Sequence, residues 1–187
     1  MVNRPNAADV VGLIPAAGKA SRLAPLPFSK EMFPIGFDAG GDDGLHPKAV
    51  SQYLLERMHD GGIEHAFIVL REGKWDIPGY LGNGRSLGMN LAYLMMDLPY
   101  GVPYTIDHAY PFLKDKFIGF GFPDIIFQPQ DAFHRLLSRQ RETDAALVLG
   151  LFSIDRFHRG EAVSLGSDGE IETVGTRANS SSAHTWI

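Results

Sequence analysis

Residues 12 to 36 read GLIPAAGKASRLAPLPFSKEMFPIG, and this stretch decides the fold. Its first residues belong to the apolar run DVVGLIP at 9 to 15, and a run of this kind is typical of a fully buried strand. Small residues follow, and then Lys19, Arg22 and Lys30 with no carboxylate among them. A cationic loop after a buried strand is either a solvated surface loop or a cradle for a polyanionic ligand.

Strand-like and helix-like patterns alternate along the rest of the chain. Apolar runs predict further strands at 65–73, 88–96, 117–122 and 144–154. Apolar residues at helical spacing predict helices at 48–62 and 129–141. The composition also predicts a hairpin at 162–175 and a Gly/Asp-rich loop at 36–48. Five mainly apolar strands separated by helices indicate an α/β fold with a mainly parallel central sheet. Ligands of such sheets bind outside the carboxyl ends of the strands, which singles out the cationic loop and Asp124.

Composition limits the classes of protein that remain. The chain has 187 residues, 44% of them hydrophobic and 21% charged, as expected for a single domain spanning 1–187. The absence of cysteine excludes thiol catalysis and disulfides, and the net charge of -5 argues against a nucleic-acid surface over the whole protein. We find neither a secretory signal nor a long apolar run, so we expect a cytoplasmic protein without a membrane partner.

The loop after the first strand has the chemistry of a phosphate site. Ala16, Ala17 and Gly18 are small enough for backbone N–H groups to approach a ligand closely, and successive N–H groups make an anion-binding concavity. Arg22 can grip phosphate oxygens with two parallel hydrogen bonds, and Lys30 can add a mobile point charge. Together these residues would suit a triphosphate.

Two common phosphate-binding motifs do not fit this loop. A Walker A loop needs four residues between its glycines and a hydroxyl residue after the lysine, whereas five residues separate Gly12 from Gly18 and Ala20 follows Lys19. A Gly-x-Gly-x-x-Gly dinucleotide fingerprint is also missing from the turn.

The segment AAGKASRLAPLPFSKEMFPIG, residues 16 to 36, resembles the signature of the sugar-1-phosphate nucleotidyltransferases. That signature is small-Gly-x-Gly-Thr-Arg-Leu, a Pro-containing spacer and Pro-Lys-x-Leu-x-Pro. KEMFPIG is closest to the bacterial UDP-glucose pyrophosphorylases, and the Ser-Lys pair is similar to that of glucose-1-phosphate thymidylyltransferases. Segments 46–69 and 81–102 match the family in the same order, so the resemblance covers roughly residues 10 to 175.

The resemblance implies a Rossmann-like three-layer α/β/α nucleotidyltransferase fold and a Mg²⁺-dependent reaction. A nucleoside triphosphate and a sugar 1-phosphate would give an NDP-sugar and pyrophosphate. Carried over by position, the resemblance implies that Arg22 and Lys30 are catalytic and that Asp124 is a ligand of Mg²⁺. It also implies that Arg177 binds the sugar phosphate and that the nucleotide is bound by Ala16, Ala17, Gly18 and Gly101. Asp124 alone would also suit a turn or a helix cap.

Departures from the family pattern restrict what the resemblance predicts. Met96 stands where many members have a base-reading glutamine, and Thr176 leaves the place of an acidic sugar-site residue empty, so neither the base nor the sugar is predicted. The family's second metal-binding aspartate would lie beyond Ile187. We therefore expect a domain that is incomplete at its C-terminus. The resemblance is also compatible with a homo-oligomer.

Two other functions stay open. One is a catalytically impaired, nucleotide-binding regulatory domain of the same fold, and the other is a cytidylyltransferase that acts on a non-sugar phosphate.

Overall fold

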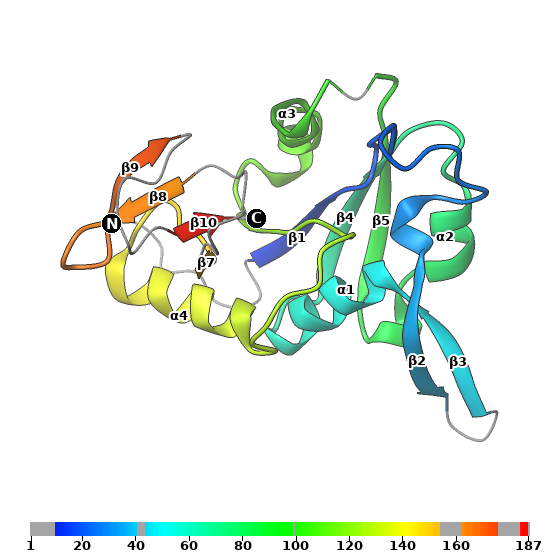
Figure 1. Ribbon diagram of the computed structural model, residues 1–187, viewed down its shortest axis with the longest axis horizontal. Helices are drawn as coiled ribbons and strands as arrows, with labels where there is room; N and C mark the ends of the chain where they lie inside the picture. The colour runs from blue at the N-terminus through cyan, green and yellow to red at the C-terminus, as the bar shows by residue number, and fades with distance from the viewer. Residues whose placement is uncertain (1–9, 41–43, 99, 154–161, 176–183, 187) are drawn as a thin grey trace.

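The protein is built around a parallel sheet. In the computed structural model, which describes residues 10–40, 44–98, 100–153, 162–175 and 184–186, four parallel strands lie in the order β5-β4-β1-β6 (Figure 1). The bounds are Val10–Pro15 for β1, His65–Leu70 for β4, Asn90–Met95 for β5 and Phe117–Phe120 for β6. Each of these strands was predicted from its apolar run, and the predicted α/β class with a mainly parallel sheet is confirmed.

The two faces of β1 pack into two separate cores, which gives the fold its three layers. Val10 and Ile14 join the core beneath α1 (Val50–Asp60) and α4 (Ala132–Thr143), whereas Val11 and Leu13 join the core beneath α3 (Val102–Leu113). Figure 1 shows α1 and α4 on one side of the sheet and α3 on the other. Because side chains alternate between the faces of a strand, an uninterrupted apolar run satisfies both cores.

The centre of β1 leaves no room for a side chain at Gly12. A Cβ there would lie 2.8 Å from Ala66 Cβ and 3.1 Å from Met58 Sδ, on the face covered by α1. We expect Gly12→Ala to lower the free energy of unfolding, measured in urea, by about 1–3 kcal/mol through overpacking. The matched control is Gly79→Ala, where nothing lies within 4 Å of the added atom, and it should leave stability unchanged or slightly raised. Equal stability of the two variants would contradict the packing described for β1.

The predicted loop at 36–48 is wrong, because this segment forms a hairpin. β2 (Pro34–Gly40) pairs antiparallel with β3 (Gly44–Ala49), with an irregularity between Pro34 and Phe37 where Gly36 has a φ of +81°. Figure 1 shows the hairpin projecting away from the central sheet. The Gly/Asp composition was misleading because some of these residues belong to the ladder itself: Asp38 pairs with His46, and Gly40 pairs with Gly44.

The predicted fifth strand at 144–154 is also largely wrong. Of its described residues, 144–153, only Leu151–Ser153 form a strand, β7, which belongs to a second sheet of order β7-β10-β8-β9; residue 154 lies outside the described residues. The remaining strands of that sheet are β8 (Ala162–Leu165), β9 (Ile171–Gly175) and β10 (His184–Trp186). Residues 145–150 are apolar in sequence but form no strand and pair with none of the described strands. The β8–β9 hairpin was predicted correctly.

The helix predictions are confirmed with small shifts in their ends. α1 is two residues shorter at each end than the predicted segment, and α4 begins at Ala132 rather than at Pro129. α3 and α2 (Asp76–Leu81) were not predicted, and short 3-10 turns occur at η2 (Lys30–Met32) and η4 (Arg85–Leu87). Among the described residues, no helix combines the length and the apolar character needed to cross a bilayer.

Candidate functional site

The loop after β1 starts with two buried alanines and then presents free backbone donors. Ala16 is anchored by a hydrogen bond from its N–H to the Val69 carbonyl oxygen at 2.9 Å, and both Ala16 and Ala17 are buried. From residue 17 to residue 22, no N–H group donates a hydrogen bond to any described residue. A run of unpaired donors at the carboxyl end of a parallel strand suits an anionic ligand.

The loop is closed by a residue in an unfavourable conformation. Ala20 has a φ of +51°, and its carbonyl oxygen accepts hydrogen bonds from the N–H groups of Leu23 and Ala24. The left-handed conformation costs an L-residue roughly 1–2 kcal/mol but suits glycine. The signature that the sequence resembles has its second glycine at the position of Ala20.

We therefore expect Ala20→Gly to raise the free energy of unfolding slightly, by up to about 1 kcal/mol, because the relief of strain outweighs the added chain entropy of glycine in the unfolded state. The matched control is Ala92→Gly, on an exposed strand position with ordinary φ, which should lower stability. Urea unfolding measures both. A loss of stability in Ala20→Gly comparable to that of the control would contradict the loop conformation.

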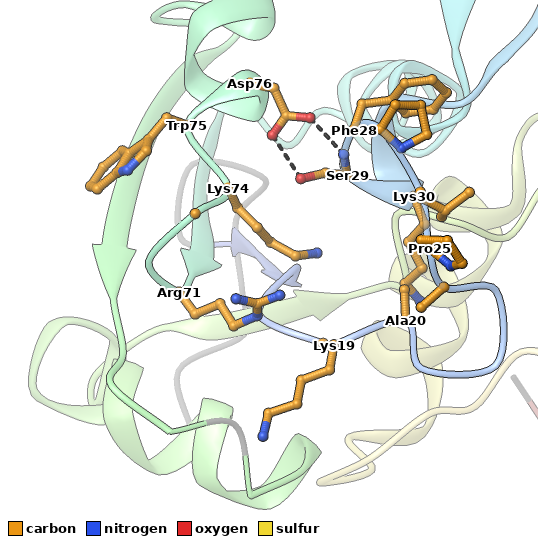
Figure 2. Close-up of a pocket in the computed structure, with 15 residues that line it drawn as sticks. Lys19, Ala20, Pro25, Phe28, Ser29, Lys30, Arg71, Lys74, Trp75 and Asp76 are labelled. Atoms are coloured by element: carbon orange, nitrogen blue, oxygen red, sulfur yellow. Dashed lines mark hydrogen bonds between the residues drawn. The ribbon is translucent and has the colours of Figure 1, made fainter.

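A cavity of about 470 Å³ lies between this loop and the segment that follows β4. It is lined by residues 18–20, 24–30, 71 and 73–76. Figure 2 shows the side chains of Arg71 and Lys74 projecting from the β4–α2 connection toward the loop, whereas Trp75 points away from it. The cavity is therefore bordered by cations from two segments that are distant in the sequence.

The structure brings together two of the residues predicted for the site. Lys30 lies in η2, and its Nζ is 2.5 Å from Asp124 Oδ2, just after β6. Both side chains are partly exposed, at 25% and 31%. The lysine and the carboxylate, 94 residues apart, thus meet at the carboxyl edge of the sheet.

The other predicted residues are more dispersed. Arg22 is exposed, does not line the cavity, and has no ion-pair partner among the described residues. Gly101 caps the start of α3 with a φ of +115°, a conformation that glycine adopts without strain. Arg177 lies outside the described residues. Met96, which by the resemblance stands where many members have a base-reading glutamine, is buried, and its Sδ is 4.0 Å from Thr105 Oγ1.

Lys30 is held in place by contacts on both of its sequence neighbours. Ser29 donates to Asp76 twice, from its backbone N–H at 2.6 Å and from its hydroxyl at 2.7 Å. Glu31 accepts hydrogen bonds from Lys74 Nζ at 2.8 and 2.7 Å, and this pair is almost fully buried, with 1% and 4% exposure. Sequence reasoning missed Lys74 and Asp76, because only the fold places them beside the motif.

The charges around the buried pair are mostly positive. Burial lowers the pKa of Lys74, the hydrogen bond and charge of Glu31 oppose that effect, and the positive charges of Lys30 and Arg71 lower the pKa further. Arg71 and Lys30 are thus close enough to Lys74 to repel its charge. An anion in the cavity would relieve this repulsion.

The contact between Ser29 and Asp76 predicts a pH dependence of stability. Burial by itself raises the pKa of Asp76, but hydrogen bonds from the Ser29 hydroxyl and backbone and from nearby N–H groups outweigh it, so the net shift is downward. A lowered carboxyl pKa stabilises the protein fully above the unfolded pKa of about 3.9, and the stabilisation is lost as the pH falls through the folded pKa.

We therefore expect Asp76→Asn to unfold at lower urea concentration than the parent protein at pH 7. The difference should hold down to about pH 5 and shrink below pH 4. Asp107→Asn, on the exposed face of α3, is the control and should show little difference at any pH. A difference for Asp76→Asn that is the same at pH 7 and pH 3 would contradict the role of its charge.

The donor set of the site fits Mg²⁺ only when substrate oxygens complete it. The described residues contain no group of three or more histidine or acidic side chains placed to hold a metal. Mg²⁺ is usually held by one or two carboxylates together with waters and substrate phosphates, however, and Asp124, beside Lys30 at the carboxyl edge of the sheet, could supply one such carboxylate. The Asp124 carboxylate would exchange its contact with Lys30 for the metal.

No family model matches the chain. A search of curated proteins found the low-salt glycan biosynthesis nucleotidyltransferase Agl11 of Haloferax volcanii, 25% identical over 107 residues. The match covers 56% of this chain and 27% of that relative. The chain therefore matches little more than a quarter of the length of the curated relative.

Solved structures resemble the protein over nearly its whole length. A protein of Bacillus anthracis assigned as a glucose-1-phosphate thymidylyltransferase, crystallised with sucrose, superimposes with a TM-score of 0.73 at 17% identity, over 95% of this chain and 68% of that one. A UDP-glucose pyrophosphorylase complexed with UDP-glucose gives 0.73 at 16% identity, over 95% and 73%. These comparisons confirm the predicted fold and the resemblance that the sequence indicated.

Proposed function

Since the protein has the fold of the sugar nucleotidyltransferases, we propose that it transfers a nucleotidyl group from a nucleoside triphosphate to a sugar 1-phosphate. The observation that carries this proposal is the meeting of Lys30 and Asp124 at 2.5 Å beside a loop of unpaired N–H groups. This arrangement supplies a cation, an oxygen ligand for a metal and an anion cradle at one edge of the sheet.

The proposed reaction asks the protein to position and neutralise phosphates. An ionised phosphate oxygen of the sugar 1-phosphate forms a bond to the α-phosphorus, the bond from that phosphorus to the bridging oxygen breaks, and pyrophosphate leaves with the electron pair. No proton has to be removed from the nucleophile, so catalysis depends on orientation and on charge stabilisation in the transition state.

Each predicted residue has a part in this reaction. The N–H groups that follow Ala16 bind phosphate oxygens, Lys30 stabilises the charge that develops at the α-phosphate, and Arg22 adds a second cation from the rim. Asp124 would hold Mg²⁺, which would supply further charge neutralisation on the triphosphate. Gly101 lets the backbone approach the base, and Arg177 is proposed to bind the sugar phosphate.

A second candidate is a regulatory domain that binds the nucleotide without turnover. Met96 favours it, because this side chain is buried and its thioether has neither the NH2 donor nor the carbonyl acceptor of the amide with which a glutamine could read a base. A regulatory domain would keep the phosphate loop and lose discrimination between triphosphates.

The two candidates differ in the release of pyrophosphate. The full-length protein should be incubated with Mg²⁺ and a panel of nucleoside triphosphates and sugar 1-phosphates. Nucleotidyl transfer predicts pyrophosphate release that requires both substrates. If a triphosphate raises the melting temperature but no pyrophosphate is released with any sugar 1-phosphate, the proposal of nucleotidyl transfer fails and the regulatory domain is favoured.

A further inference from the structure

Arg71 lines the cavity and is positively charged, but it lies outside the 16–36 segment that resembles the family signature. It comes directly after β4, the strand beside β1, so it enters the site from the adjacent strand end (Figure 2). Its Nη1 donates to the neighbouring Glu72 carbonyl oxygen at 2.8 Å. Its Nε is buried, and no described residue accepts a hydrogen bond from it.

Asp76 lines the cavity, Glu31 and Asp124 contact residues that line it, and all three carboxylates are already engaged by other groups. Glu31 is paired with Lys74, Asp76 accepts two hydrogen bonds from Ser29, and Asp124 is paired with Lys30. Arg71 and Lys19 line the same cavity and form no ion pair with any described residue. The unpaired charge at the cavity is therefore positive, and a buried donor without an acceptor is destabilising until a ligand supplies one.

We propose that Arg71 binds a phosphate group of the nucleoside triphosphate, as a second phosphate-binding arginine from outside the signature loop. This inference rests on the proposed function. A guanidinium suits this role because its N–H groups form a planar fork that matches two phosphate oxygens. Arg22, which is exposed and lies off the cavity lining, would then be the outer of two arginines and Arg71 the inner one.

The proposal predicts an order of affinities that a structural role would not produce. Arg71→Gln should weaken the binding of both inorganic tripolyphosphate and nucleoside triphosphate by about tenfold or more. Arg71→Lys should keep part of the affinity, because it retains the charge and loses the fork. In turnover, Arg71→Gln should raise the KM for the triphosphate and leave the KM for the sugar 1-phosphate unchanged.

The test is isothermal titration of the full-length protein with tripolyphosphate and with nucleoside triphosphate, each with Mg²⁺ and without sugar phosphate. Melting temperatures verify that the variants are folded, and Arg85→Gln, exposed in η4 away from the cavity, should bind as the parent protein does. Binding by Arg71→Gln equal to that of the parent, or no binding of either ligand by the parent, would overturn the proposal.

The same experiment separates this inference from the proposed function. If tripolyphosphate binding depends on Arg71 but no pyrophosphate is released with any substrate pair, the inference stands and nucleotidyl transfer fails. If pyrophosphate is released but Arg71→Gln does not change the affinity for tripolyphosphate or nucleoside triphosphate, nucleotidyl transfer stands and the inference fails.

Discussion

Replacement of Lys30 with methionine should reduce turnover by about a hundredfold or more while the protein stays folded. The expected loss follows from removing the cation that we propose stabilises the charge developing at the α-phosphate, and stabilisation of this kind typically supplies a factor of this size. The pair of Lys30 with Asp124 is partly exposed, so its loss should cost little stability. The measurement is steady-state pyrophosphate release by the full-length protein, alongside urea unfolding.

The control for this variant is Lys114→Met, which removes an exposed lysine directly after α3. It should leave turnover close to that of the parent protein. Asp124→Asn should resemble Lys30→Met in activity, because it removes the proposed oxygen ligand of Mg²⁺ from the same place. Turnover of Lys30→Met within a few-fold of the parent would remove Lys30 from the chemistry.

The largest effect on stability is expected from Lys74→Met. This change leaves the Glu31 carboxylate buried without its partner, and breaking a buried ion pair from one side typically costs about 3–5 kcal/mol. The loss should appear in urea as a fall in the midpoint of unfolding. Because Glu31 adjoins Lys30, activity should fall as well, even where the variant is kept folded.

A double variant distinguishes the buried charge from the loss of packing. Glu31→Leu with Lys74→Met removes both charges, and replacing a buried pair by apolar side chains of similar size is often close to neutral. We expect the double variant to recover most of the stability that Lys74→Met loses. A single variant within 1 kcal/mol of the parent, or a double variant less stable than the single one, would contradict the account of this pair.

The central sheet was predictable because each of its strands is an apolar run, and the two inner strands, β1 and β4, are mostly buried on both faces. A run such as that at 65–70 needs no information beyond its own apolar residues and its flanking turn signals to be read as a strand. The β8–β9 hairpin was predictable from its turn for a similar local reason. Apolar residues at 145–150 look the same in sequence, but a strand also needs a neighbour, and local pattern does not report neighbours.

The sequence could indicate only part of the candidate site, because local pattern does not report which segments become neighbours in the fold. The signature loop is contiguous, so the sequence alone indicated a phosphate cradle with Lys30, and the strand end indicated Asp124. Arg71 and Lys74 lie in the connection after β4 and Asp76 begins α2, and nothing in the spacing of these residues marks them. They belong to the site because β4 lies beside β1 in the sheet, which is a property of the strand order.

Nucleotidyl transfer is tested most directly by following the phosphorus atoms of the triphosphate. The full-length protein should be given Mg²⁺, a sugar 1-phosphate and nucleoside triphosphate labelled at either the α- or the γ-phosphate. Attack at the α-phosphorus predicts that the α-label appears in an NDP-sugar and the γ-label in pyrophosphate, both only when the sugar 1-phosphate is present. An α-label recovered as free nucleoside monophosphate regardless of the sugar 1-phosphate, or a γ-label released as inorganic phosphate, would contradict the proposed function.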